Sequence, residues 1–192
     1  MKPLHLKIIL TAVCILAILA FIYISYADFD KNDRRNPTND GLTSIIDFDV
    51  DCPEVGTSAK GTIFVMQSKN SVKMIITADL NVGETDIGGI EIGFPKEIDV
   101  VSVFCSFKGD ISGEYVRIHG PMEIGGWVDI GRRPYIGGPL SGGGQGMLIL
   151  ELQLSESVKL SEIDSLEISI YVGGKDNIMG LVGERFTIPI LH

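Results

Sequence analysis

The sequence predicts an all-β domain, an antiparallel two-sheet sandwich of jelly-roll type, preceded by one N-terminal transmembrane helix. Two observations predict this class. The run Ile8–Ala27 is apolar, contains no charged residue and has no counterpart later in the chain. From Ser44 onwards, short segments alternate apolar and polar residues and are separated by glycines. This pattern is typical of half-buried strands joined by turns.

The run Ile8–Ala27 has the length of a membrane span. Its 20 residues would cover roughly the 30 Å of a bilayer core at about 1.5 Å each. We expect an uncleaved signal-anchor in the cell membrane, with residues 1–7 in the cytoplasm and the C-terminal domain outside. The alternative is a secreted protein cleaved after Ala27, because Ser25 and Ala27 supply the small residues of a signal-peptide cleavage site.

A polar linker and one long domain follow the apolar run. Residues 28–42 are rich in Asp, Asn and Arg and include Pro37, a composition that cannot bury a core. Residues 43–192 are expected to form the extracellular β-sandwich. Its first strand alternates Ile46, Phe48 and Val50 with aspartates. The same alternation recurs in Val72–Leu80, Ile90–Phe94, Leu148–Leu154, Leu166–Val172 and Phe186–Ile190. We expect about ten strands and one helical turn near residues 160–165.

The charge of the chain excludes one class of partner. All 25 acidic residues and 14 of the 16 basic residues lie after Ala27, so this part has a net charge of −11. Such a charge repels nucleic acid and anionic headgroups. We therefore expect no nucleic-acid binding and, in the absence of any cofactor motif, no cofactor.

Two cysteines lie in the predicted domain, Cys52 and Cys105. Each shares the alternation of the apolar residues around it, so both thiols should point into the core. Buried free thiols are the favoured interpretation. A disulfide between them is the alternative outside the cytoplasm, but it requires that the two strands lie next to each other.

No pattern predicts a metal site. Asp47, Asp49 and Asp51 lie on the polar face of the first strand, where Ca²⁺ would relieve their mutual repulsion. The spacing of a calcium loop fails because Cys52 stands where such a loop needs glycine. A solvated strand face is the favoured interpretation.

No pattern predicts catalysis either. Of the three histidines, only His119 lies in a position to serve a site, and its alternation groups it with Tyr115 and Arg117 on a polar face. No serine motif or acid marks the other members of a catalytic triad. We expect a protein that is not an enzyme.

Several apolar segments resemble strands of cohesin-type domains. The residues in question are Ile87–Pro95, the following Ile98–Val103, and the glycine-opened segment Gly146–Leu152. The glycine-rich stretch 131–146 departs from that pattern, and related sandwiches such as carbohydrate-binding modules share such short motifs. The resemblance implies non-catalytic protein binding, in which a face of the sandwich receives a small extracellular partner module. It assigns no functional residue to this chain.

Trp127 is the strongest candidate for a binding side chain. Val128 and Ile130 carry the apolar alternation of their segment, so Trp127 should share the outer face with Asp129. One interpretation is that the neighbouring glycine-rich loop covers the indole. The other is a stacking platform for a sugar, with Tyr135 as a second aromatic ring and Arg132 and Arg133 as polar neighbours. The resemblance to cohesin-type domains implies a surface-displayed module that binds an extracellular protein, and Trp127 makes polysaccharide binding the alternative.

Overall fold

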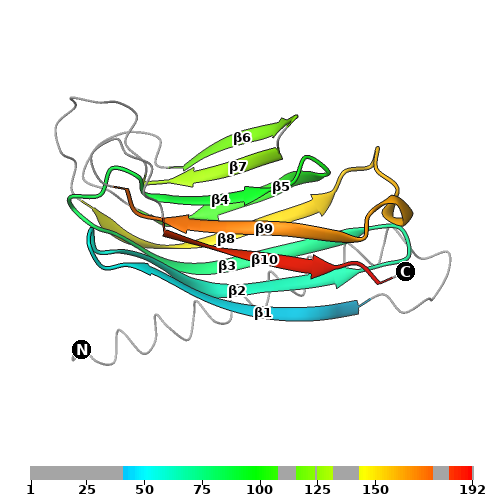
Figure 1. Cartoon of the computed structure of the whole chain (residues 1–192), viewed down its shortest axis with the longest axis horizontal. Coiled ribbons are helices and arrows are strands. Elements are labelled where there is room, and N and C mark those ends of the chain that lie inside the picture. The colour runs from blue at the N-terminus through cyan, green and yellow to red at the C-terminus, as the bar shows by residue number, and fades with distance from the viewer. Residues whose placement is uncertain (1–40, 108–115, 124, 132–142, 175–181, 192) are drawn as a thin grey trace, which may run out of the picture. The chain divides into compact units, whose positions relative to one another are not determined.

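Two antiparallel sheets form the domain. The structure, a computed structural model, describes residues 41–107, 116–123, 125–131, 143–174 and 182–191 (Figure 1). Sheet A has the strand order β1-β2-β3-β8-β5, and sheet B has the order β10-β9-β4-β7-β6. The strands of sheet A are β1 (Gly41–Cys52), β2 (Thr57–Gln67), β3 (Val72–Val82), β8 (Gly144–Leu154) and β5 (Ile98–Cys105). Those of sheet B are β10 (Val182–Pro189), β9 (Ser165–Val172), β4 (Ile90–Phe94), β7 (Gly125–Ile130) and β6 (Val116–Met122).

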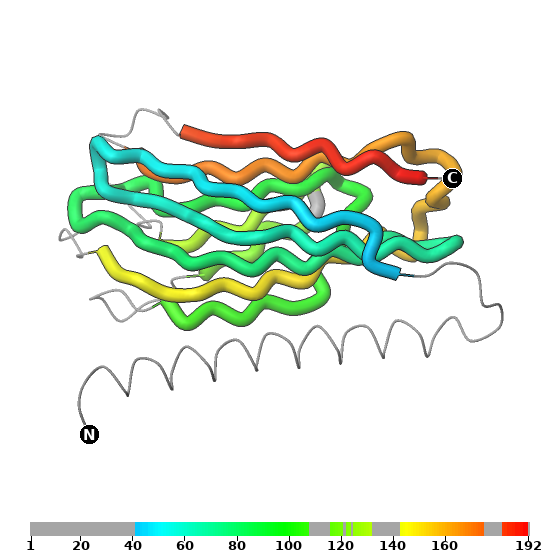
Figure 2. Tube along the Cα trace, turned by 90° about the horizontal axis from the view of Figure 1, so that it is seen from below, coloured from blue at the N-terminus to red at the C-terminus, as the bar shows by residue number. Residues whose placement is uncertain are grey.

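The expected all-β class, with its two antiparallel sheets, is confirmed. The ten strands of the described residues match the expected number, and a 3₁₀ turn, η1 (Leu160–Glu162), occupies the expected helical position. Strand β1 begins at Gly41, before the predicted start of the domain, because Gly41 and Leu42 pair with Gln67 and Met66 of β2. Figure 2 shows β1, β2 and β3 as neighbouring strands of one layer, followed by β8.

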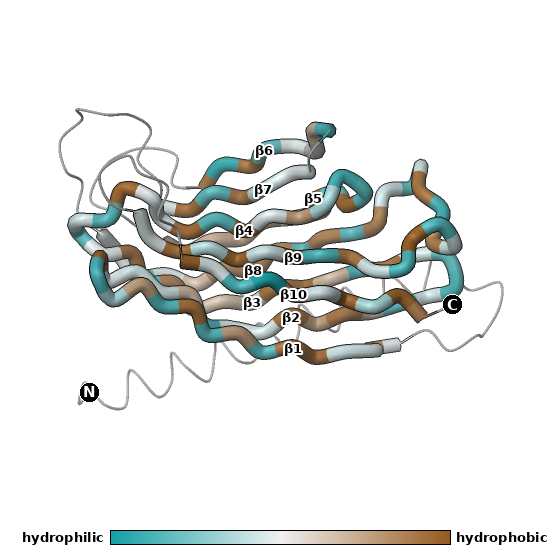
Figure 3. The backbone as a smooth tube through the Cα atoms, viewed as in Figure 1, coloured by the Kyte–Doolittle hydropathy of each residue, from teal (hydrophilic) through white to brown (hydrophobic). Residues whose placement is uncertain are grey.

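The core lies between the sheets and follows the predicted alternation. Along β1, Phe48 and Val50 are buried, whereas Asp47, Asp49 and Asp51 are exposed. The same alternation appears as brown and teal bands along the strands in Figure 3. The most completely buried large side chains of this core are Ile63, Met74, Ile76, Ile90, Ile92, Ile98, Ile130, Leu148, Leu150 and Leu152. Burying these apolar surfaces is the main stabilising contribution to the fold.

The other face of sheet A is partly apolar. Ile75 is buried, yet it lies outside the core cluster and pairs with Phe64 and Glu151 on the neighbouring strands. Glu151 forms an ion pair with Lys73 and accepts a hydrogen bond of 3.0 Å from the hydroxyl of Ser102. Because both charged groups are buried, each one needs the other to offset its loss of hydration.

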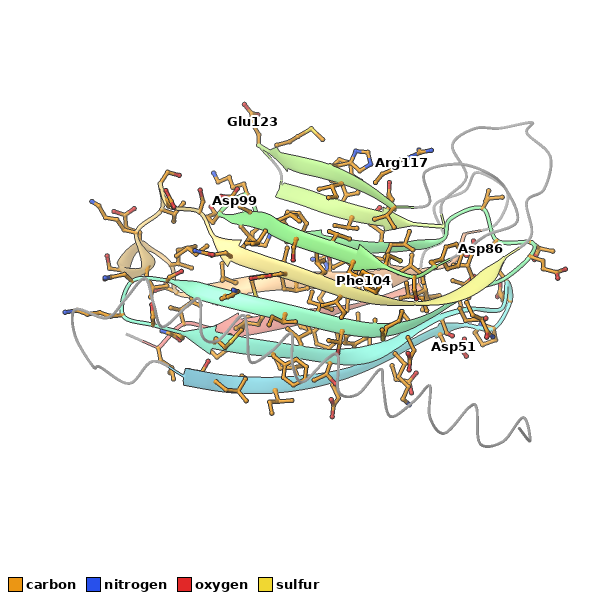
Figure 4. The ribbon with its side chains drawn as sticks, turned by 180° about the vertical axis from the view of Figure 1, so that it is seen from behind. Asp51, Asp86, Asp99, Phe104, Arg117 and Glu123 are labelled. Atoms are coloured by element: carbon orange, nitrogen blue, oxygen red, sulfur yellow. The ribbon has the colours of Figure 1, made fainter. Side chains whose placement is uncertain are left out.

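A buried carboxylate joins the two sheets at one end of the sandwich. Asp86, only 2% exposed, lies between β3 of sheet A and β4 of sheet B and is labelled in Figure 4. It accepts hydrogen bonds from the backbone amides of Gly88 (2.7 Å), Gly89 (3.2 Å) and Gly174 (2.8 Å) and from the hydroxyl of Thr57. Thr57 begins β2 and Gly174 follows β9, so this one side chain connects segments of both sheets.

Replacing Asp86 should destabilise the domain strongly. In Asp86→Ala, three backbone amides and one hydroxyl lose a charged acceptor, and we expect the free energy of unfolding to fall by about 3 kcal/mol or more. Urea denaturation followed by circular dichroism measures this change. The matched control is Asp51→Ala at an exposed position of β1, where we expect a change within about 0.5 kcal/mol. Equal losses in the two variants would contradict the structural role of Asp86.

Candidate functional site on the outer face of sheet B

Strand β7 places Trp127 on the outer face of sheet B. Val128 and Ile130 are fully buried in the core, and Trp127 is half-buried on the other side, as the alternation predicts. Asp129 shares this outer face but is only 5% exposed. Cross-strand neighbours therefore cover Asp129, which the sequence grouped with Trp127 as a surface residue.

His119 covers one face of the indole. It pairs with Trp127 across β6 and β7, and the two rings stack with centroids 4.7 Å apart and planes inclined by 17°. Nε2 of His119 also lies 3.1 Å from Oδ2 of Asp129. The stack and this hydrogen bond together fix the imidazole against the sheet.

Two glycines near Trp127 allow other residues to approach the backbone closely. Gly93 of β4 pairs with Trp127 on one side and with Ser169 of β9 on the other. A Cβ atom at Gly93 would lie 2.5 Å from Oγ of Ser169. Gly126 lies against the ring of Phe94, which a Cβ atom there would approach to 2.4 Å. The glycines near Trp127 are thus explained by the close approach of specific neighbours.

Polar side chains surround these residues. Tyr171, Glu91, Asp129 and Arg117 form one row across β9, β4, β7 and β6, and Arg117 is labelled in Figure 4. Nε of Arg185 donates a hydrogen bond of 3.0 Å to the hydroxyl of Tyr171. This bond, together with the nearby Tyr171 and Glu167, raises the pKa of Arg185 above its ordinary value. Arg185 therefore remains a cation under all ordinary conditions.

The structure brings together only part of the predicted sugar site. Trp127 and Asp129 lie side by side on the outer face, whereas Tyr135, Arg132 and Arg133 lie outside the described residues. Sequence reasoning missed Gly93, Ser169 and the Tyr171–Arg185 pair. Their strands are distant from Trp127 in the chain, and no local pattern indicates which strands become neighbours in the sheet.

His119 and Asp129 do not form a catalytic triad with Ser169, the serine that lies in the same cross-strand row as His119. Ser169 lies three strands away from His119 in sheet B, a separation of about 14 Å at the usual strand spacing. A nucleophile and its general base must approach within hydrogen-bond distance. The His119–Asp129 pair instead orients a ring that supports Trp127.

Two of the three aspartates of β1 have protein partners. Asp49 forms an ion pair with Lys60, and Asp47 accepts a hydrogen bond of 2.8 Å from the hydroxyl of Thr62. Asp49 in turn raises the pKa of the exposed Lys60 through their hydrogen bond. Within the ranges that the structure describes, no group of three or more His, Cys, Asp or Glu residues could hold a metal ion.

The two cysteines are free and lie on opposite edge strands of sheet A. Cys52 ends β1 and Cys105 ends β5, and four strand spacings of about 4.8 Å separate these strands. A disulfide requires Cα atoms within about 7 Å, so the condition of adjacent strands is not met. Burial raises the pKa of the Cys105 thiol, and a hydrogen bond from the backbone of Phe107 partly opposes this shift.

Comparison with known proteins adds no relative: no family model matches the chain, and no curated protein sequence matches it. No helix among the described residues is long and apolar enough to cross a membrane. The segment 8–27 lies outside those residues.

Both thiols of the domain should react slowly in the folded protein. The thiolate is the reactive form, and Cys105 forms it less readily because its pKa is raised, while Cys52 is buried. We expect iodoacetamide at pH 7.5 to modify both at least about tenfold more slowly than in urea, with Cys52 the slower of the two. Peptide mass spectrometry measures each site. A disulfide-linked peptide, or full modification at the denatured rate, would contradict this expectation.

Proposed function

We propose that the protein is a membrane-anchored, surface-displayed and non-catalytic interaction module that binds an extracellular protein partner in a cohesin-like manner. In this proposal residues 8–27 form the anchor, residues 28–40 act as a tether, and the sandwich is of jelly-roll type. The order of apolar strands that resembles cohesin-type domains supports the proposal.

The observation that carries the proposal is a group of exposed apolar side chains at one edge of the sandwich. Strand β5 ends sheet A, β6 ends sheet B, and the two strands contact each other. They carry Val101 (50% exposed), Phe104 (55%), Ile118 (52%) and Met122 (50%). We call these four residues the β5–β6 edge patch. The register places Phe104 beside Ile149 on the outer face of sheet A and Ile118 beside the buried Val128 on the inner side of sheet B. Exposed apolar residues along one edge of a sandwich are typical of protein interfaces.

The strands themselves add to this support. As terminal strands of their sheets, β5 and β6 offer backbone groups on one side that no described strand pairs with. A partner can add an extended segment to such an edge and bury apolar side chains at the same time. Figure 4 labels Phe104 of β5 and Arg117 of β6 toward one end of the sandwich, with Asp99 and Glu123 toward the other end. Charged residues therefore border the patch.

Charges introduced into the β5–β6 edge patch should abolish partner binding. We expect the double variant Phe104→Asp/Ile118→Asp to retain less than a tenth of the partner recovered by the wild-type protein, because buried carboxylates without partners oppose binding by several kcal/mol. The measurement is affinity capture of the full-length protein from membranes of its own cells, followed by quantitative mass spectrometry.

The matched control for this experiment is Ile45→Asp. Ile45 is 57% exposed on β1, at the opposite edge of sheet A, so this variant should recover the partner normally. Thermal unfolding confirms that all variants are folded. Equal recovery by the edge variant and the wild-type protein would refute protein binding at this edge.

Carbohydrate binding at Trp127 is the second candidate function. The observation in its favour is that the indole is only half-buried and lies on a polar face next to Asp129 and Arg117. An aromatic ring among groups that form hydrogen bonds is the usual composition of a sugar site. The apolar character of the β5–β6 edge patch favours the protein partner. Only Ile118 and Met122 of that patch belong to sheet B, and Val101 and Phe104 belong to sheet A.

The anchor makes a separate prediction. If residues 8–27 span the membrane, the protein should remain in the membrane pellet after alkaline carbonate extraction, and its N-terminal peptide should include residues before Ile8. Mass spectrometry of the intact chain tests both points. A soluble chain that begins at Asp28 would contradict the anchor and support secretion.

A further inference from the structure

We propose that Trp127, Gly93 and Ser169 form a site for one pyranose ring of a neutral oligosaccharide on the outer face of sheet B. This inference rests on the carbohydrate-binding candidate above and names its binding residues and its class of ligand. It places the sugar on the face of the indole that His119 does not cover, directly above Gly93.

The orientation of the indole follows from its stack with His119. The two residues oppose each other on adjacent strands. Their ring centroids are 4.7 Å apart, close to the spacing of about 4.8 Å between strands. The planes are nearly parallel, at 17°, so the rings stack in the direction that crosses the strands. The second face of the indole is therefore turned toward β4.

Gly93 has no side chain, and the atoms within 4 Å of the position of a Cβ atom there belong to Ser169 and not to Trp127. Gly93 is the residue of β4 that pairs with Trp127. A ring that stacks on the indole at about 3.5–4.0 Å would lie above Gly93, within one strand spacing of about 4.8 Å. Ser169 pairs with Gly93 from the other side, and its Oγ lies 2.5 Å from the position of a Cβ atom there. The hydroxyl of Ser169 thus lies over Gly93, where it can meet a ring that stacks on the indole.

The surroundings favour a sugar over the side chain of a protein partner. The exposed large apolar side chains of the described residues are Leu42, Ile45, Val101, Phe104, Ile118, Met122, Val182 and Leu191. None of them lies in the cross-strand row that contains Trp127 (Arg185, Ser169, Gly93, Trp127 and His119) or in the row that contains Tyr171. A protein anchor residue gains affinity from a wider apolar pocket. A pyranose ring needs one apolar face for the indole and polar groups for its hydroxyls, which Ser169 and the Tyr171–Arg185 pair provide.

The charge of the domain favours a neutral sugar. The part of the chain after Ala27 has a net charge of −11, which opposes the approach of anionic polysaccharides. Arg185 pairs with Ser169 across β10 and β9 and is the cation in the row of this site. It already forms a hydrogen bond with Tyr171 and an ion pair with Glu167. Hexoses and their N-acetylated forms carry no charge and meet no such opposition.

The chain contains one tryptophan, so its intrinsic emission reports on this site alone. The experiment titrates the full-length protein, in micelles of a detergent without a sugar headgroup, with the hexasaccharides of cellulose, xylan, mannan and chitin. We expect at least one of them to change the emission of Trp127. Isothermal titration calorimetry supplies the dissociation constant.

The variant that tests the geometry is Gly93→Val. Valine suits a strand and can displace the Ser169 hydroxyl, so the domain should fold while the new side chain fills the space beside the indole. We expect binding to weaken about tenfold or more. The matched control is Gly120→Val on β6, where a Cβ atom would meet nothing within 4 Å. This control should bind like the wild-type protein, and Ser169→Ala should bind more weakly than it.

The outcomes separate the inference from the function on which it rests. Binding that is lost in Gly93→Val and retained in Gly120→Val supports the site. Binding that is lost in Trp127→Ala but unchanged in Gly93→Val and Ser169→Ala overturns the proposed position of the ring and leaves carbohydrate binding standing. No binding of any hexasaccharide at millimolar concentration overturns both.

Discussion

The arrangement of the two sheets depends on the hydrogen bonds that the buried carboxylate of Asp86 accepts. This carboxylate lies where the chain crosses from β3 of sheet A to β4 of sheet B and holds the amides of Gly88, Gly89 and Gly174. The first two amides lead directly into β4. Strand β4 is the centre of sheet B, and its register places Gly93 between Trp127 and Ser169. The Asp86 carboxylate therefore holds the start of the strand that carries Gly93.

The two candidate surfaces differ in chemistry and suit different partners. The β5–β6 edge patch exposes apolar side chains on strands that end their sheets, so burial of apolar area and added strand pairing would drive binding there. The outer face of sheet B carries one indole among charged and hydroxyl groups, and its ligand must satisfy hydrogen bonds. Because different residues form them, a single protein can carry both surfaces, and variants of one leave the other intact.

Much of the fold could be predicted from the sequence, but the neighbours of the site could not. Alternation placed Phe48 and Val128 in the core and Trp127 outside, because successive side chains of a strand point to opposite faces. Alternation does not reveal strand order. It therefore left open whether Cys52 and Cys105 lie on adjacent strands, and it could not identify the cross-strand partners of Gly93. It also placed Asp129 on the surface, although cross-strand neighbours bury that residue. The anchor and the partner remain predictions that rest on the sequence.

The central claim is that the β5–β6 edge patch is the surface that meets a protein partner. The most direct measurement is site-specific photo-crosslinking in intact cells, with the photoreactive residue at position 104 in one strain and at position 45 in another. Both positions are exposed, at opposite edges of sheet A. The account predicts one discrete protein adduct at position 104 and none at position 45. The absence of an adduct at position 104, or the same adduct at both positions, would contradict it.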